Sequence, residues 1–168
     1  MISTLFDGVI PDSGDYAKKI VTWAAKNGNF LRIGVDRFTT HDLSVIITDE
    51  NGKRVNNPYY GGIYSIYHFK NNNPHKCLYV GTSKTDIHYR LYRFFKELMD
   101  MSRDDENHPA AKKARLSGIK ETDDLRFMYF SWNEIPKPPE KCYFIKEKLD
   151  EYIAFLLKSE YNTNVSRF

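Results

Sequence analysis

Two tyrosines, an arginine and a lysine lie close together within residues 61–95, and their side chains suit phosphate chemistry. Tyr64 ends a Gly-Ile-Tyr string, Tyr79 opens a Tyr-Val-Gly string, and Arg90 follows on the C-terminal side. A guanidinium fork can pair with phosphodiester oxygens and stabilise the charge of the transition state. A phenol has a pKa of about 10, so it becomes a useful base at neutral pH only if a cation such as Lys84 or Arg90 lowers that value.

The local sequence predicts that a hairpin and a helix carry these side chains. Residues 61–69 alternate between two faces as a strand does, and residues 77–80 continue as its partner strand. Residues 70–76, with three asparagines and a proline, are typical of a turn. Asp86 is placed to cap a following helix. The apolar stripe of that helix consists of Ile87, Leu91, Phe94, Phe95 and Leu98. Arg90 falls one step off the stripe, at the edge of the core.

Three more elements are expected after this helix. Proline suits the first turn of a helix, so a short helix should begin at Pro109 and end at Gly118. Residues 125–132 have the composition of a third strand, and a final helix is expected from about residue 140 to 158. The order after residue 61 is therefore two strands, helix, short helix, strand and helix.

The first part of the chain predicts a helix over residues 12–28 and strands over residues 29–35 and 43–48. An Asn-Gly pair at residues 51–52 is the signal of a hairpin turn. We divide the chain into a helix-plus-strands extension, residues 1–58, and a second part, residues 59–168. The expected fold class is α/β of the α+β type.

Composition describes a globular protein with a modest positive charge. The net charge is +3. Residues 1–58 hold seven basic and seven acidic side chains, so the whole excess of positive charge lies in residues 59–168. This bias fits an anionic partner. Two cysteines exclude a disulfide framework and a zinc site built from cysteine alone. The first residues lack the pattern of a signal peptide, and no apolar run approaches the roughly 20 residues of a membrane span. We expect a cytoplasmic protein.

The strings Gly-Ile-Tyr and Tyr-Val-Gly, followed by Arg90, resemble the GIY-YIG nuclease family. The order of elements agrees with that family, and Glu147 stands fifteen residues before Asn162, as in one homing-enzyme pattern. The small size of the chain is similar to that of phage, mobile-element or restriction-like members. The resemblance implies a small antiparallel or mixed three-stranded sheet flanked by helices.

The resemblance also implies roles for individual residues. Tyr64 would be the general base, with Tyr79 as the alternative, and Arg90 would stabilise the charged transition state. Glu147, in preference to Glu151, would bind Mg²⁺ or Mn²⁺, which prefer oxygen ligands. The other implied catalytic residues are His108 and Asn162.

The function implied by the resemblance is metal-dependent cleavage of double-stranded DNA by a monomer or homodimer. The predicted phosphate contacts are Lys84, Lys112, Lys113 and Arg115. One residue departs from the family pattern, because Phe94 stands where a histidine or tyrosine is common. Tyr92, His88 or His108 could supply the missing polar group. The departure also favours an alternative, a GIY-YIG-like module that binds DNA or protein without cutting. A third possibility is a regulatory protein that recruits a partner through residues 1–56.

Overall fold

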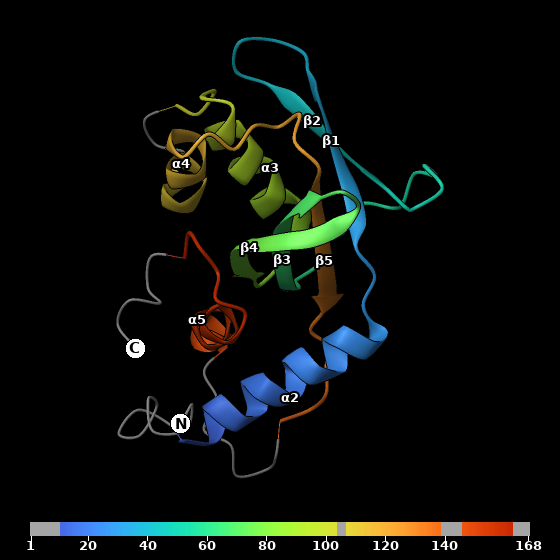
Figure 1. The fold of residues 1–168 in the computed structure, drawn as a ribbon, viewed down its shortest axis with the longest axis vertical. Coiled ribbons are helices and arrows are strands. Elements are labelled where there is room, and N and C mark those ends of the chain that lie inside the picture. The colour runs from blue at the N-terminus through green and yellow to red at the C-terminus, as the bar shows by residue number, and fades with distance from the viewer. Residues whose placement is uncertain (1–10, 104–106, 139–145, 163–168) are drawn as a thin grey trace.

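The computed structural model describes residues 11–103, 107–138 and 146–162. Along the chain the elements are α2 (Pro11–Asn27), β1 (Leu31–Arg37), β2 (Leu43–Thr48), β3 (Gly62–Lys70), β4 (Asn73–Ser83), α3 (Ile87–Leu98), α4 (Pro109–Leu116), β5 (Leu125–Ser131) and α5 (Lys146–Leu156). This is an α+β fold with one five-stranded antiparallel sheet and, within those ranges, four helices (Figure 1).

The strands follow the order β2-β1-β5-β3-β4, which corrects the prediction of a three-stranded sheet. The three expected strands are present as β5-β3-β4, but β5 also pairs on its other edge with Leu31 and Arg32 of β1. β2 then pairs along its full length with residues 32–37 of β1. Residues 1–58 therefore contribute two strands to the same sheet as the rest of the chain, and their division into a separate functional part stays a prediction.

A tight turn joins β3 to β4 and makes β4 longer than expected. Asn71 and Asn72 have φ angles of 52° and 62°, and Lys70 pairs directly with Asn73. Two consecutive positive φ values are typical of the two-residue hairpin turn whose twist matches the strands, and asparagine tolerates that conformation. The predicted turn over residues 70–76 thus shrinks to two residues. β4 begins at Asn73.

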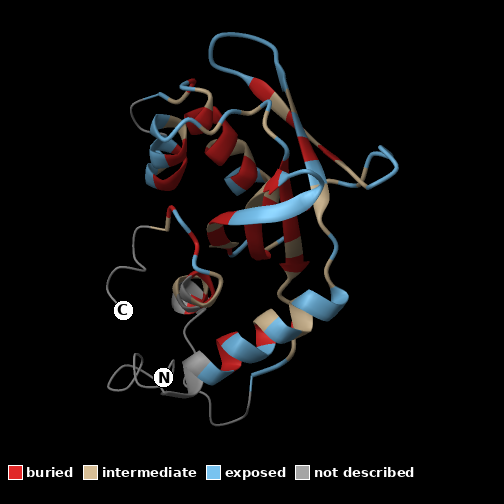
Figure 2. Ribbon diagram, in the orientation of Figure 1, coloured by how far each residue is buried: buried red, intermediate tan, exposed pale blue. Residues whose placement is uncertain are grey.

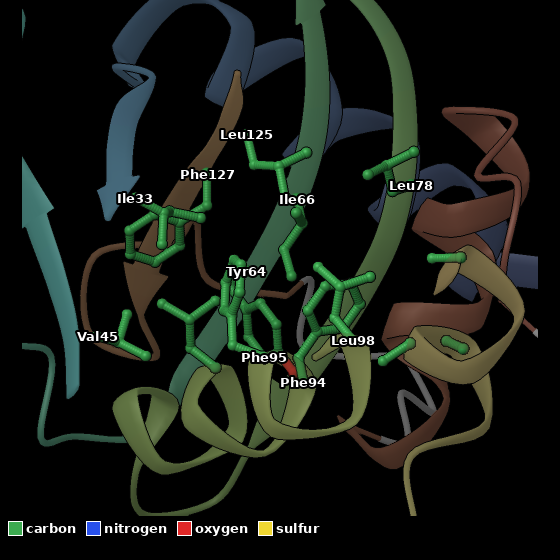
Figure 3. Packing of buried hydrophobic residues seen from close by; sticks show 14 of the residues in the cluster. Ile33, Val45, Tyr64, Ile66, Leu78, Phe94, Phe95, Leu98, Leu125 and Phe127 are labelled. Atoms are coloured by element: carbon green, nitrogen blue, oxygen red, sulfur yellow. The ribbon is translucent and has the colours of Figure 1, made fainter. Parts of the chain in front are cut away.

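Buried side chains form one cluster on each face of the sheet. α3 and α4 cover the face that carries Tyr64 and Ile66, where Phe94 and Phe95 are fully buried (Figure 3). α2 and α5 cover the opposite face and pack around Ile63. The two helix pairs occupy the upper and lower halves of Figure 1. The burial pattern in Figure 2 shows the corresponding stripes on α2 and α3.

The predicted helix boundaries agree with the structure where it describes them. The Asp86 carboxylate caps α3 by accepting from the backbone N–H of Tyr89 at 2.9 Å. Pro109 occupies the first turn of α4, as expected. The predicted start of the last helix, near residue 140, lies outside the described residues. In the parts of the chain that the structure describes, no helix is both long and apolar enough to cross a membrane.

Candidate active site

Tyr64 and Tyr79 lie on adjacent strands and share one face of the sheet. Tyr64 is opposite Gly81 and Tyr79 is opposite Ile66, so the two phenols are diagonal neighbours with ring centroids 6.1 Å apart. Both phenols have pKa values above the ordinary value of 10. Burial dominates both values. It holds the pKa of Tyr64 well above 10 and that of Tyr79 at about 12.

The glycines of the two tripeptides are needed because other groups approach them closely. A Cβ on Gly81 would lie 2.5 Å from the Tyr64 hydroxyl oxygen and 2.8 Å from Cε1 of Tyr79. A Cβ on Gly62 would collide with the backbone carbonyl of Phe130 on β5. Gly81 therefore leaves room for the phenol pair, and Gly62 lets β3 approach β5.

Arg90 reaches this pair from an exposed position on α3. Its positive charge lowers the pKa values of Tyr64 and Tyr79, although burial outweighs the effect. Arg90 also lines an open cleft of about 620 Å³ together with Lys84 and Arg93. The remaining lining residues are mostly hydroxylic: Thr82, Ser83, Thr85, Asp86 and Tyr89. The carboxylate of Asp86 is engaged in capping α3, so the cleft offers mainly cations and hydroxyl groups to a ligand.

His108 packs against Tyr79 although it is distant in sequence. Its ring makes edge contacts with Tyr79 and Phe94 at centroid distances of 5.1 and 5.3 Å. Its Nδ1 accepts from the backbone N–H of Ala111 at 3.3 Å and so caps α4. Burial and the nearby charges of Arg93 and Arg90 lower the pKa of His108 to about 4. The ring is therefore neutral at pH 7, and because Nδ1 is an acceptor, its proton lies on Nε2.

Phe94, the departure from the family pattern, lies within this aromatic group. Its ring is fully buried and stacks on Tyr79 with centroids 6.0 Å apart. Of the three candidates for the missing polar group, Tyr92 donates its hydroxyl to a carboxylate before β2, and His88 packs against a tyrosine before β3. Of the three, His108 alone has a ring contact with Tyr79.

The carboxylate that the structure brings to the phenols is Asp150 of α5, which the sequence analysis missed. Its charge raises the pKa values of both Tyr64 and Tyr79. Burial raises the pKa of Asp150 itself to about 7, and the backbone N–H of Glu151 donates to its Oδ1 at 3.0 Å. Glu147 lies one turn earlier in α5, but its side chain is outside the described residues. The spacing of the family pattern led to Glu147 and Glu151. The signal that could have indicated Asp150 is its position next to Leu149, an apolar residue that is buried in α5.

Asn162 connects the end of α5 to the free edge of β4. Its Nδ2 donates to the carbonyl of Val80 at 2.8 Å, and the N–H of Val80 donates to its Oδ1 at 2.9 Å. Glu160 and Tyr161 donate their N–H groups to the carbonyls of the two residues before Tyr79. The Asn162 amide therefore holds α5 against the strand that carries Tyr79, which is a positioning role.

The predicted basic contacts separate into two groups. Lys112 and Lys113 are exposed on α4, and Lys84 is exposed at the cleft. Arg115 is half-buried and donates to the carbonyl of Glu97 at 2.7 Å and to Oδ1 of Asp100 at 2.9 Å. These bonds tie α4 to the end of α3, so Arg115 has a structural task.

Within the described residues, no three side chains of His, Cys, Asp or Glu gather as a closed metal site would require. An all-protein cage is not the arrangement that Mg²⁺ prefers, since this ion usually takes one or two carboxylates together with water and substrate phosphate. Asp150 fits such a ligand, because desolvation of its half-buried carboxylate disfavours the charged form and a cation would favour it. Comparison with known protein families, curated proteins and solved structures finds no match for this chain.

Proposed function

We propose that the protein is a metal-dependent DNA endonuclease that hydrolyses phosphodiester bonds in the manner of the GIY-YIG nucleases. The observation that carries the proposal is that side chains distant in sequence come together in one place. Side chains from five separate elements or caps, Tyr64, Tyr79, Arg90, His108 and Asp150, interact around one pair of phenols. Phenols, a guanidinium and a carboxylate beside a basic cleft suit the binding and hydrolysis of a phosphodiester.

Arg90 has the position of a phosphate ligand in this proposal. Its side chain is exposed in the cleft, yet its charge reaches the phenol pair. A guanidinium can hold two phosphate oxygens at once, and its charge remains fixed over the working pH range. Arg90 would thus place the scissile phosphate beside the phenols and stabilise the negative charge that develops during attack.

The difference in burial favours Tyr79 over Tyr64 as the base. Tyr79 is half-buried, whereas Tyr64 is only 2% exposed, so desolvation disfavours the Tyr64 phenolate more strongly. Ionising a phenol with a pKa of about 12 costs about 7 kcal/mol at pH 7. Tyr79 can therefore accept a proton only when added positive charge lowers that cost, with Tyr64 as its neighbour in the site.

The α5 carboxylates are the proposed ligands of Mg²⁺ or Mn²⁺, Glu147 from the resemblance and Asp150 from the structure. When bound there, a divalent cation supplies the positive charge that stabilises a leaving oxygen and acidifies water. His108 is neutral at pH 7 and keeps its proton on Nε2. It would donate that N–H to a phosphate oxygen or to the attacking water, which replaces the polar group absent from Phe94.

A nicking assay on supercoiled plasmid tests the proposal. We expect cleavage with Mg²⁺ or Mn²⁺ and none in EDTA. Tyr79→Phe should lower the cleavage rate by about 100-fold or more, since a positioned acid or base contributes about that much, and DNA binding should survive. Tyr67→Phe is the matched control because Tyr67 lies on β3 but packs on the opposite face. Cleavage in EDTA, or wild-type cleavage by Tyr79→Phe, would refute the mechanism.

A second candidate function is a module that binds DNA or protein without cutting. The apolar Phe94 beside Tyr79, and the high pKa values that burial gives both tyrosines, favour this alternative. The same assay separates the two functions when it includes duplex, single-stranded and branched DNA. Folded protein that binds DNA but cleaves none of these substrates with either metal ion would support the binding module.

A further inference from the structure

Three tyrosines are exposed around the N-terminal end of α3, outside the proposed catalytic group. Tyr59, Tyr60 and Tyr89 expose 65%, 40% and 51% of their surface. Single exposed aromatic residues are common, but a group of them on one face is a recognised mark of a binding surface. We call Tyr59, Tyr60 and Tyr89 the tyrosine strip.

Local contacts fix the backbone at Tyr60 and the ring of Tyr59. The N–H of Ile87 donates to the carbonyl of Tyr60 at 2.9 Å, which holds the segment before β3 against the start of α3. The ring of Tyr59 packs on that of His88 with centroids 4.9 Å apart, and Asn57 donates to its hydroxyl at 3.0 Å. A ring that is already oriented loses little conformational entropy when a ligand stacks on it.

One member of the tyrosine strip lines the basic cleft. Tyr89 lines the cleft beside Lys84, Arg90 and Arg93, and it also stacks loosely on Tyr92, with ring centroids 6.3 Å apart. Aromatic rings that border a row of cations are the arrangement by which proteins bind unpaired nucleic acid, with phosphates on the cations and bases on the rings.

We propose that the tyrosine strip binds the unpaired bases of a DNA strand whose phosphates occupy the basic cleft. In a duplex the faces of each base are covered by its neighbours, so exposed phenol rings can stack only where a strand is unpaired. The preferred substrate is then duplex DNA with a single-stranded tail or gap beside the bound phosphate. This inference rests on the proposed action on DNA, and it replaces plain duplex DNA with a partly unpaired substrate.

Binding measured by fluorescence anisotropy in EDTA tests the inference without cleavage. The probes are a blunt duplex, the same duplex with a tail of thymidines, and the same duplex with a tail of abasic sites. The thymidine tail should tighten binding by about 10-fold or more, since each stacked base contributes about 1–3 kcal/mol. The abasic tail has the same phosphates without the bases, so it should give only a small, salt-sensitive gain.

Variants of the strip should remove the advantage of the thymidine tail. Tyr59→Ala should bind the tailed and blunt duplexes with similar affinity, whereas Tyr59→Phe, which keeps the ring, should retain most of the preference. Leu116→Ala is the control for loss of an exposed apolar side chain on another helix. Equal binding of the thymidine and abasic tails, or an unchanged preference in Tyr59→Ala, would overturn the proposal and favour a protein partner for the strip.

The result of this binding test can be distinguished from the result of the nicking assay. Nicking with Mg²⁺ or Mn²⁺ but no preference for the thymidine tail would refute the tyrosine strip alone. A preference for the tail without nicking of any substrate would refute the nuclease mechanism and leave the strip in place.

Discussion

Replacing Asp150 with asparagine should stabilise the folded protein at neutral pH. Burial holds the pKa of Asp150 at about 7 in the folded state, against an ordinary value of 3.8. Between these values the folded state binds more protons than the unfolded state, so the wild type loses stability as the pH rises through this window. Asparagine is uncharged and still offers its Oδ1 to the N–H of Glu151, so the variant should not lose stability through this group.

The expected size follows from the difference between the two pKa values of Asp150. The change from 3.8 to about 7 corresponds to about 4 kcal/mol at 1.36 kcal/mol for each pKa unit. The carboxyl group is partly exposed, and solvent screening should reduce the effect to about 2 kcal/mol. In a chain of 168 residues this corresponds to a rise in Tm of about 4–8 °C.

The measurement is thermal or urea unfolding of wild type and Asp150→Asn from about pH 4 to about pH 8. The stability difference should be near zero at the acidic end, grow as the pH rises, and level off above about pH 7. Glu151→Gln is the matched control. The charge of Glu151 acts by raising the pKa of Asp150, so its removal should give a smaller effect of the same sign. Parallel stability curves for wild type and Asp150→Asn would refute the reasoning.

The same pair of proteins tests the metal assignment at about pH 7.5. Mg²⁺ or Mn²⁺ should raise the Tm of the wild type, because a ligand that binds only the folded state stabilises it by mass action. Asp150→Asn should show a smaller rise. An equal rise in both proteins would remove Asp150 from the proposed ligands.

Three further substitutions give separate expectations. Gly81→Ala places a Cβ 2.5 Å from the Tyr64 hydroxyl oxygen, so urea unfolding should show a loss of about 1–3 kcal/mol and nicking should fall sharply; an unchanged rate would show that the phenol pair tolerates displacement. His108→Asn keeps an acceptor for the cap of α4, so its Tm should stay close to wild type while nicking falls, whereas an active variant would exclude the proposed Nε2 donor. Asn162→Ala loses both hydrogen bonds to Val80 and should be about 2 kcal/mol less stable by urea unfolding, a loss that a merely exposed amide would not produce.

Local signals predicted most of the second half of the fold. The apolar stripe and Asp86 placed α3 with its observed start, and the strand pattern located β3 and β5 to within one residue. The pairing of β1 with β5 was not predictable in the same way, because both edges of a strand carry the same backbone donors and acceptors. Which strand lies beside an edge is decided by contacts distant in sequence. The three-stranded prediction was incomplete for this reason.

The candidate site shows the same division between local and distant information. Tyr64, Tyr79 and Arg90 follow one another on consecutive elements, so their proximity was readable from the sequence. Asp150 approaches the phenols only because α5 packs on the edge of β4 through residues 159–162, and no spacing rule reports that contact. Asn162 was expected from the family pattern to act in catalysis, which stays a prediction, and its amide holds the main chain of Val80.

Arg90 and Asp150 have opposing effects on the phenols, and for this electrostatic reason we expect cleavage to require a metal ion. Both groups act on the same two phenols, Arg90 favouring phenolate and Asp150 opposing it, while burial opposes it more strongly than either. A bound phosphodiester would add a further negative charge and raise the cost of ionising Tyr79 again. Positive charge added beside Asp150 would favour the phenolate form, and no residue would have to move. If cleavage persisted in EDTA, Asp150 would replace Tyr79 as the candidate base, since its pKa of about 7 already suits neutral pH.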